Sequence, residues 1–291
     1  MKKRFYFLTI SFILLGALIY FSDVGNLLEV LGKSNIYLII IGIGVWTLGN
    51  IIRSLRWKYL LSKVGMDISL KDTIPIFTAG LFLSNISPAK SGDPIRSLLL
   101  KRNKGYSFSK SLPSIFIERI MDLTTIILIS IIGVAILTAR LGQISFWLNI
   151  AVTVWIGLIS LGIYIGISKR RTKKFLSKIQ SIFSFIPKID EMKDEMEKLS
   201  ENIHKSFMTY KNKKTLFTVF LLTVTAWFLE GIIIIVAFYS LGLEITYVSA
   251  VSAVAIGILI GIFTILPGAL GSYEIISVTF FMAIYSYSTA E

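Results

Sequence analysis

The sequence predicts an all-α fold: a polytopic bundle of membrane-embedded helices that forms one domain over residues 1–291. Of the 291 residues, 54% are hydrophobic and 16% are charged, and the mean hydropathy is +0.75. Soluble domains carry about 45–50% apolar and about 25% charged residues, so this chain has too few charged residues to cover a water-exposed surface. Long apolar runs alternate with clusters of Lys and Arg, which is typical of spans and loops in membrane proteins.

Seven apolar runs predict seven membrane spans, since a spanning helix needs about 17–25 mostly apolar residues. In order, the runs are 5–21, 34–52, 123–139, 141–168, 215–243, 245–273 and 275–290. We expect the third helix to begin before its apolar run, near Pro113. The first run follows Lys2, Lys3 and Arg4 and also resembles a signal peptide, but residues 22–25 lack a small-x-small cleavage site, which favours an uncleaved helix.

The distribution of charge predicts the orientation. Loop 169–214 carries thirteen Lys and Arg against six acids, and 53–110 is also basic, whereas 22–33 holds two acids and one Lys. The positive-inside rule therefore predicts a multi-pass protein of the cell membrane with a cytoplasmic N-terminus, the two basic loops inside and residues 22–33 outside. This bias and attraction to anionic lipids account for the net charge of +13, so we expect no nucleic-acid partner.

Cysteine is absent and His204 is the only histidine, which excludes thiol nucleophiles, Cys-ligated metals and multi-His sites. The acidic cluster at 190–195 lies among lysines, and we interpret it as a solvated helix face rather than a magnesium site. We therefore predict no catalytic residue, no metal and no cofactor.

Loop 169–214 contains two stripes of apolar residues at helical spacing. The first is Phe175, Ile179, Ile182 and Ile186. It predicts a basic amphipathic helix on the inner leaflet, ended by Pro187. The second is Met192, Met196, Leu199, Ile203 and Phe207, flanked by Asp194–Lys198 and Glu201–Lys205 at i, i+4. The hairpin either packs on its own spans or offers a docking surface to a partner.

Segment 73–89 is apolar but contains Pro75 and Pro88 and has basic residues on both sides, which predicts a re-entrant hairpin rather than a span. Pro88-x-x-x-Gly92 before Asp93 and Pro94 is matched by Pro267-x-x-x-Gly271 before Ser272, with Glu274 two residues later. Asp93 and Ser272 are the predicted helix N-caps. Two such breaks suggest an inverted repeat whose helix N-termini meet at an anion site. The alternative is two ordinary interhelical breaks.

Several ionisable residues fall inside or beside apolar runs, where each costs about 2.5–3.5 kcal/mol unless it is paired or faces a cavity. Glu118 and Asp122 share one helix face, and Arg119 alone cannot neutralise both. Arg53 and Arg56 are candidate partners, although Arg56 and Lys58 also fit cations that extend to the membrane surface. Glu230 interrupts run 215–243.

Three stretches together resemble the lysylphosphatidylglycerol synthase transmembrane-region family, also called UPF0104 or flippase-like. They are Gly92-Asp93-Pro94-Ile95-Arg96, Glu118-Arg119-Ile120-Met121-Asp122 and Pro267-Gly268-Ala269-Leu270-Gly271-Ser272-Tyr273-Glu274. The resemblance covers nearly the whole chain in order. Ala269 replaces a usual Gly, and the chain stops soon after the seventh run, where family members often have one more helix.

The resemblance implies a membrane lipid translocase that moves an anionic phospholipid or lipid-linked headgroup between leaflets. Alternatives are a non-catalytic membrane partner of a polyprenyl-phosphate glycosyltransferase and an integral-membrane lipid transferase. The expected partners are membrane lipids with an anionic headgroup and a glycosyltransferase or lipid-modifying enzyme, and the oligomeric state is left open. In the translocase hypothesis, Arg53, Arg96 and Arg119 hold the headgroup, and Glu118, Asp122 and Glu274 neutralise them when no substrate is bound. The substrate-binding residues are completed by the two breaks, namely Pro88, Gly92, Pro267 and Gly271.

Overall fold

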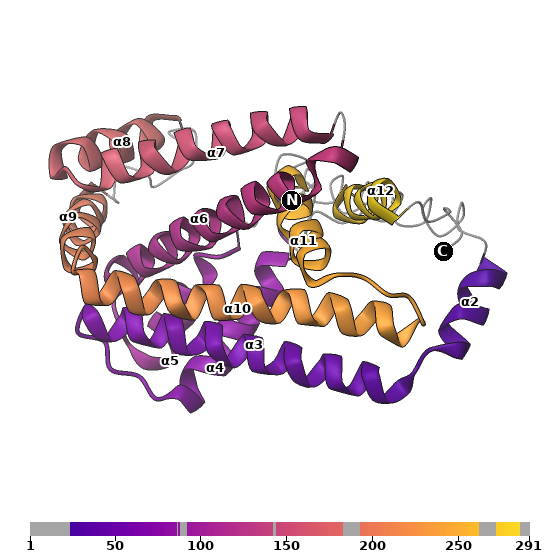
Figure 1. Cartoon of the computed structure of the whole chain (residues 1–291). Coiled ribbons are helices and arrows are strands. Elements are labelled where there is room, and N and C mark those ends of the chain that lie inside the picture. The colour runs from indigo at the N-terminus through magenta and orange to yellow at the C-terminus, as the bar shows by residue number, and fades with distance from the viewer. Residues whose placement is uncertain are drawn as a thin grey trace.

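The computed structural model describes residues 24–85, 87, 92–141, 144–182, 193–261 and 272–285. Every regular element in these ranges is an α-helix, which confirms the predicted all-α class (Figure 1). The first predicted span at 5–21, Pro88 and the 267–271 turn lie outside the described residues. A short helix, α2 (Val24–Lys33), precedes the bundle.

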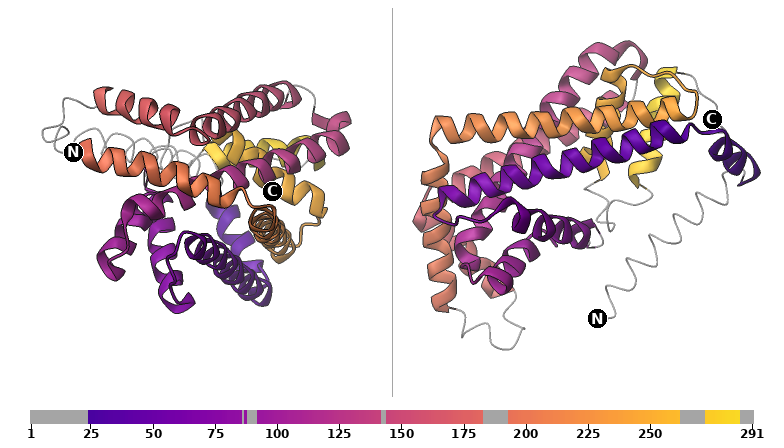
Figure 2. Two further views of the ribbon diagram at one scale, coloured as in Figure 1. Left: turned by 90° about the vertical axis from the view of Figure 1, so that its left-hand side faces the viewer. Right: turned by 90° about the horizontal axis from the view of Figure 1, so that it is seen from below.

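Two long helices, α3 (Ile36–Lys63) and α10 (Lys213–Ser240), lie side by side in opposite directions (Figures 1 and 2). The Asn35 backbone N–H donates to Ser240 O at 2.8 Å, and near the other end Tyr210 Oη donates to Leu60 O at 3.1 Å. Each helix has 28 residues, or about 42 Å, which exceeds the hydrocarbon core of about 30 Å. Of the described helices, these two are long and apolar enough to cross a membrane.

A third helix, α6 (Phe108–Leu141), runs beside this pair and leads to α7 (Ile144–Gly166). The early start of α6 confirms that its helix precedes the apolar run, although Pro113 lies inside it rather than at its start. The chain bends by 114° between α7 and α8 (Lys169–Ile182), and this pair would be a third span if counted as one.

The centre of the bundle is α11 (Tyr247–Gly261), which packs against α10, α6 and α12 (Ser272–Tyr285). Ala250, Ile256 and Leu259 of α11 are fully buried. A Cβ added at Gly133 of α6 would lie 2.1 Å from Ser252 Oγ, so the small residue allows the two helices to approach closely. Residues 262–271 and 286–290 of the predicted runs 245–273 and 275–290 lie outside the described residues.

Helices α4 (Leu70–Asn85) and α5 (Ile95–Lys104) form a hairpin in which the start of α4 lies beside the end of α5. Lys104 Nζ pairs with Asp72 Oδ1 at 2.8 Å, and Tyr106 Oη donates to Asp67 O at 2.5 Å. The chain thus enters and leaves this hairpin at the same end of the bundle, as the re-entrant prediction requires. Because α4 already begins at Leu70, Pro75 lies inside the helix and does not open it.

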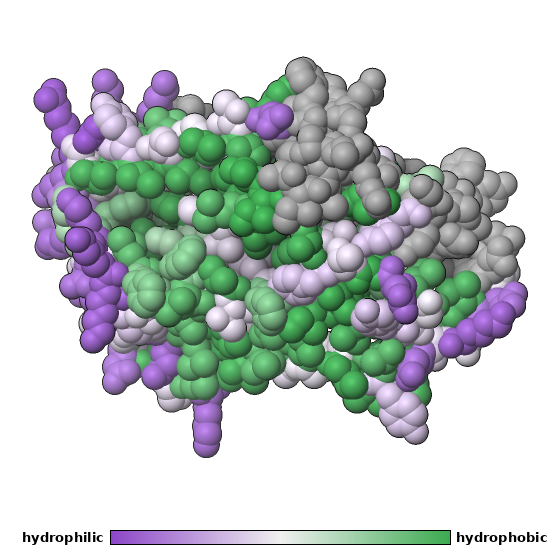
Figure 3. Space-filling model, viewed as in Figure 1, coloured by the Kyte–Doolittle hydropathy of each residue, from purple (hydrophilic) through white to green (hydrophobic). Residues whose placement is uncertain are grey.

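The predicted helices of loop 169–214 are present as α8 and α9 (Lys193–Tyr210). Asn202 Nδ2 donates to Ser109 Oγ of α6 at 2.8 Å, and Lys169 Nζ lies 3.5 Å from Glu201 Oε1, which joins the two helices. The predicted Glu201–Lys205 pair is confirmed at 3.4 Å. These contacts support packing of the hairpin on its own bundle. Figure 3 shows hydrophilic side chains gathered at this end and a broad hydrophobic surface across the middle.

Candidate functional site

Six charged side chains of alternating sign form one chain of contacts inside the bundle. They come from α3, α5, α6 and the turn before α5. In order of contact they are Arg96, Glu118, Arg56, Asp122, Arg119 and Asp93. The three arginines and three carboxylates give these six side chains no net formal charge.

Arg56 occupies the centre of the chain. Its Nη1 donates to Asp122 Oδ1 at 2.6 Å and its Nη2 to Asp122 Oδ2 at 3.1 Å, a bidentate pair. Its Nε donates to Glu118 Oε1 at 3.2 Å, and Nη1 also reaches Thr223 Oγ1 of α10 at 2.8 Å. Arg56 is 2% exposed and Glu118 is fully buried, so this part of the chain is closed to solvent.

Arg96 forms one end of the chain. Its Nη2 lies 2.8 Å from Glu118 Oε2, while Nε and Nη1 have no hydrogen-bond acceptor among the described residues. The guanidinium carbon lies 5.1 Å from the Trp57 ring centre and 4.8 Å from that of Phe77, which gives cation–π contacts. A Cβ at Gly80 of α4 would lie 1.9 Å from Arg96 Cγ, so glycine is required for this side chain to fit.

Arg119 is the most accessible member of the chain, with a side chain 34% exposed. Its Nε lies 2.7 Å from Asp93 Oδ2, and its Nη1 lies 3.6 Å from Asp122 Oδ2. The prediction that Asp93 caps α5 is wrong. Helix α5 begins after Pro94 with no side-chain cap, because the Asp93 carboxylate pairs with Arg119 instead.

Of the other predicted site residues, Pro88, Pro267 and Gly271 lie outside the described residues, and Arg53 and Glu274 lie apart from these six side chains. Arg53 pairs with Glu230 of α10, and both side chains are mostly buried. Glu274 lines a separate apolar pocket with Tyr273 and Phe281. Gly92 is buried, and a Cβ there would lie 2.5 Å from Leu83 O, so glycine lets the backbone before α5 approach α4 closely.

The structure therefore brings Arg96, Glu118, Arg119 and Asp122 together but not Arg53 or Glu274. The sequence named Arg56 as a candidate partner of Glu118 and Asp122 but not as a substrate-binding residue. The ion pairs with both acids are present, and the alternative of a cation at the membrane surface is wrong, because Arg56 is 2% exposed and pairs with α6. The signal was present: two acids on one face of α6 exceed the one arginine beside them. Among the described residues, no group of three His, Cys, Asp or Glu could hold a metal ion.

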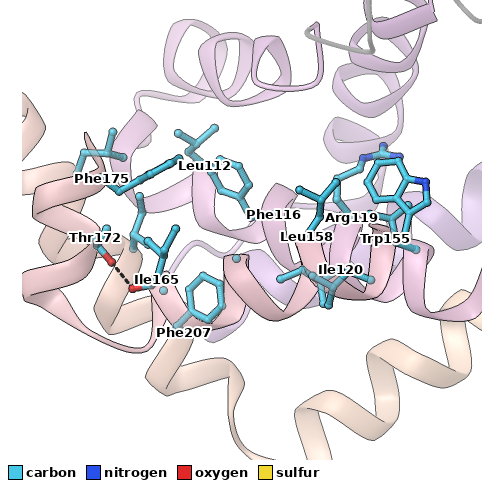
Figure 4. Close-up of a pocket in the computed structure, with 16 residues that line it drawn as sticks. Leu112, Phe116, Arg119, Ile120, Trp155, Leu158, Ile165, Thr172, Phe175 and Phe207 are labelled. Carbon is cyan, nitrogen blue, oxygen red and sulfur yellow. Dashed lines mark hydrogen bonds between the residues drawn. The ribbon is translucent and has the colours of Figure 1, made fainter. Parts of the chain in front are cut away.

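An apolar groove of about 350 Å³ adjoins the exposed end of the charge chain. It lies between α6, α7, α8 and α9, and Arg119 is the one charged residue in its wall. Figure 4 shows Arg119 and Trp155 at one end and Thr172 and Phe175 at the other. An amphiphile could thus contact the charge chain and an apolar wall at once.

Residues 8–290 match the family described as the lysylphosphatidylglycerol synthase TM region. The chain belongs to this family. It is 26% identical over 286 residues to a UPF0104 membrane protein of Methanothermobacter thermautotrophicus, covering 94% of this chain and 81% of the relative. A UPF0104 membrane protein of Pyrococcus horikoshii is 20% identical over 293 residues, covering 97% of this chain and 88% of that protein.

A more distant relative carries an enzyme name. Glycosyltransferase AglD of Haloferax volcanii is 22% identical over 307 residues, which cover 95% of this chain but 48% of that protein. No solved structure matches the chain. Membership of a membrane-protein family agrees with the helices long enough to span a bilayer.

Proposed function

We infer that the protein moves an anionic phospholipid, or an anionic lipid-linked headgroup, between the leaflets of the cell membrane. The observation that supports this most is the neutral chain of three arginines and three carboxylates inside an apolar bundle, with Arg119 exposed at the edge of an apolar groove. In this proposal the loops at the α8–α9 end face the cytoplasm, following the charge bias of the sequence.

The chemistry is an exchange of partners. A bare arginine cluster inside a membrane would be costly, so each arginine is held by a carboxylate when no substrate is present. An incoming phosphate accepts hydrogen bonds from a guanidinium in the same bidentate manner as a carboxylate does. It can therefore take the place of Asp93 or Asp122 as an acceptor for Arg119, and the displaced carboxylate loses that hydrogen bond.

The test is a leaflet assay in proteoliposomes. Fluorescent phospholipids with anionic, zwitterionic and cationic headgroups are incorporated one at a time, and the fraction reached by a membrane-impermeant quencher is followed. We expect the protein to accelerate movement of the anionic lipids above the rate in protein-free vesicles. Equal rates with and without protein for every headgroup would contradict the proposal.

A second candidate function rests on the match to AglD, where a region like this chain makes up about half of a protein named as a glycosyltransferase. In that reading the chain is a non-catalytic membrane partner of such an enzyme, and the exposed basic face of α8 is its docking surface. Purification that recovers a glycosyltransferase in stoichiometric amount, together with no lipid movement by the chain alone, would favour this function.

A further inference from the structure

The groove beside Arg119 is about as long as one membrane leaflet is thick. Its wall on α6 extends from Leu112 to Leu123, eleven residue steps that correspond to about 17 Å. Half of the hydrocarbon core of a bilayer is about 15 Å thick. The volume of about 350 Å³ falls within the range of about 300–1,000 Å³ found for ligand sites in proteins.

The groove wall is suited to a hydrocarbon chain. The polar groups in the wall other than Arg119 donate hydrogen bonds to the protein itself. Thr172 Oγ1 donates to Ile165 O at 2.9 Å, and Trp155 Nε1 donates to Leu259 O at 3.2 Å. The guanidinium of Arg119 is held by Asp93 and Asp122. An occupant therefore meets aliphatic and aromatic surface along the groove and reaches the charge chain only at its deep end (Figure 4).

The outer end of the groove meets a strongly basic helix. Thr172 and Phe175, which line this end, belong to α8, and α8 contains six Lys and Arg and no acid. The 114° bend after α7 turns α8 away from the axis of α7, so it lies across the end of the groove (Figure 4). Basic side chains at a membrane surface attract anionic lipid headgroups.

We propose that this groove is a loading site for one acyl chain of an anionic phospholipid from the leaflet on the α8 side, with the lipid phosphate held by basic residues of α8. The site rests on the proposed lipid translocation, for which it supplies the substrate beside Arg119. It selects lipids by headgroup charge at α8 and holds the acyl chain by apolar contact along the groove.

The experiment measures binding rather than movement. The protein in nanodiscs of zwitterionic lipid receives a small fraction of phosphatidylglycerol that carries a diazirine at the end of one acyl chain. After illumination, mass spectrometry locates the adducts. Phosphatidylcholine with the same diazirine is the matched probe, because it reports contact with bulk lipid. We expect phosphatidylglycerol adducts on Ile120, Leu123 and Trp155 to exceed phosphatidylcholine adducts about fivefold or more, which corresponds to a preference of about 1 kcal/mol or more.

Two glycines of α7 provide a matched pair of variants. A Cβ added at either Gly162 or Gly157 would meet no atom within 4 Å, but Gly162 lies in the groove wall and Gly157 does not. We expect Gly162→Leu to fill the groove and reduce the phosphatidylglycerol adducts to the phosphatidylcholine level, and Gly157→Leu to leave them unchanged. Replacing both Arg170 and Lys174 of α8 by Gln should lower the phosphatidylglycerol adducts to the phosphatidylcholine level and leave the phosphatidylcholine adducts unchanged.

Equal labelling by the two lipids, or labelling unaffected by Gly162→Leu, would overturn the loading site even if the protein moves lipid. Selective labelling by a protein that moves no lipid would keep the binding site and refute the translocation proposal instead.

Discussion

Arg56 and Asp122 are 66 residues apart in the sequence and form a two-bond pair inside the bundle, with N–O distances of 2.6 and 3.1 Å. Arg56 also donates to Glu118, so one arginine of α3 binds both acids that share one face of α6. This pairing fixes how α3 lies against α6 and leaves Arg119 available at the edge of the charge chain.

The first prediction concerns this central arginine. Arg56→Met leaves two buried carboxylates short of a partner, and we expect a loss of about 3–5 kcal/mol of stability because an unpaired buried charge is costly. Thermal unfolding in detergent measures the loss. Adding Asp122→Leu to Arg56→Met removes one of the orphaned carboxylates and should recover part of it. Losses that simply add would show that the two residues are not coupled.

The second prediction concerns Gly80. A Cβ at this position would lie 1.9 Å from Arg96 Cγ, so Gly80→Ala forces the arginine away from Glu118. We expect destabilisation of about 1–3 kcal/mol, as for other overpacked sites. Gly44→Ala on exposed α3 surface is the control, since its Cβ would meet nothing within 4 Å. If Gly80→Ala unfolds at the same temperature as Gly44→Ala, the packing of Arg96 against α4 is wrong.

The third prediction tests the pair between α3 and α10. Glu230→Gln weakens a partly buried charge-assisted hydrogen bond to Arg53, and such bonds contribute about 1.5–3 kcal/mol. We expect a smaller loss than for Arg56→Met because both side chains retain some exposure. The charge-swapped variant Arg53→Glu/Glu230→Arg should unfold closer to the parent temperature than either single change. A swap no better than the single variants would argue against a direct pair.

The fourth prediction concerns topology. The ends of the α4–α5 hairpin lie together, so Lys71→Cys and Asn103→Cys should be labelled from the same side of the membrane as Lys173→Cys on α8. Gly32→Cys on α2 should be labelled from the opposite side. The parent chain has no cysteine, so each label reports one position. Labelling of Lys71→Cys and Asn103→Cys from opposite sides would replace the re-entrant hairpin by a span.

Much of the helical framework could be predicted because hydropathy and charge are local. Run 215–243 became α10 with nearly the same limits, and the apolar stripes of 169–214 became α8 and α9. The end of α3 could not be found this way. A charged residue was read as the end of the span at Arg53, but the helix continues because Arg53 and Arg56 find acids on α10 and α6.

The site was predictable in its residue types more than in its contacts. Glu118 and Asp122 at i, i+4 indicated a shared face and a need for cations. Which arginines supply the charge depends on how helices pack, and the periodicity within one helix does not contain that information. Asp93 shows the same limit, since a good local cap signal was overridden by a tertiary contact with Arg119.

The proposed translocation through Arg119 is tested by the rate at which a fluorescent anionic phospholipid changes leaflet in vesicles that contain the Arg119→Gln protein. Asp93→Asn is added to keep the charge chain neutral, and Arg102→Gln, an exposed change on α5, is the control for loss of one positive charge. We predict that Asp93→Asn/Arg119→Gln folds with near-parent thermal stability but loses tenfold or more in rate, about 1.4 kcal/mol or more of barrier, while Arg102→Gln keeps the parent rate. A well-folded Asp93→Asn/Arg119→Gln protein that moves the lipid at the parent rate would contradict the account.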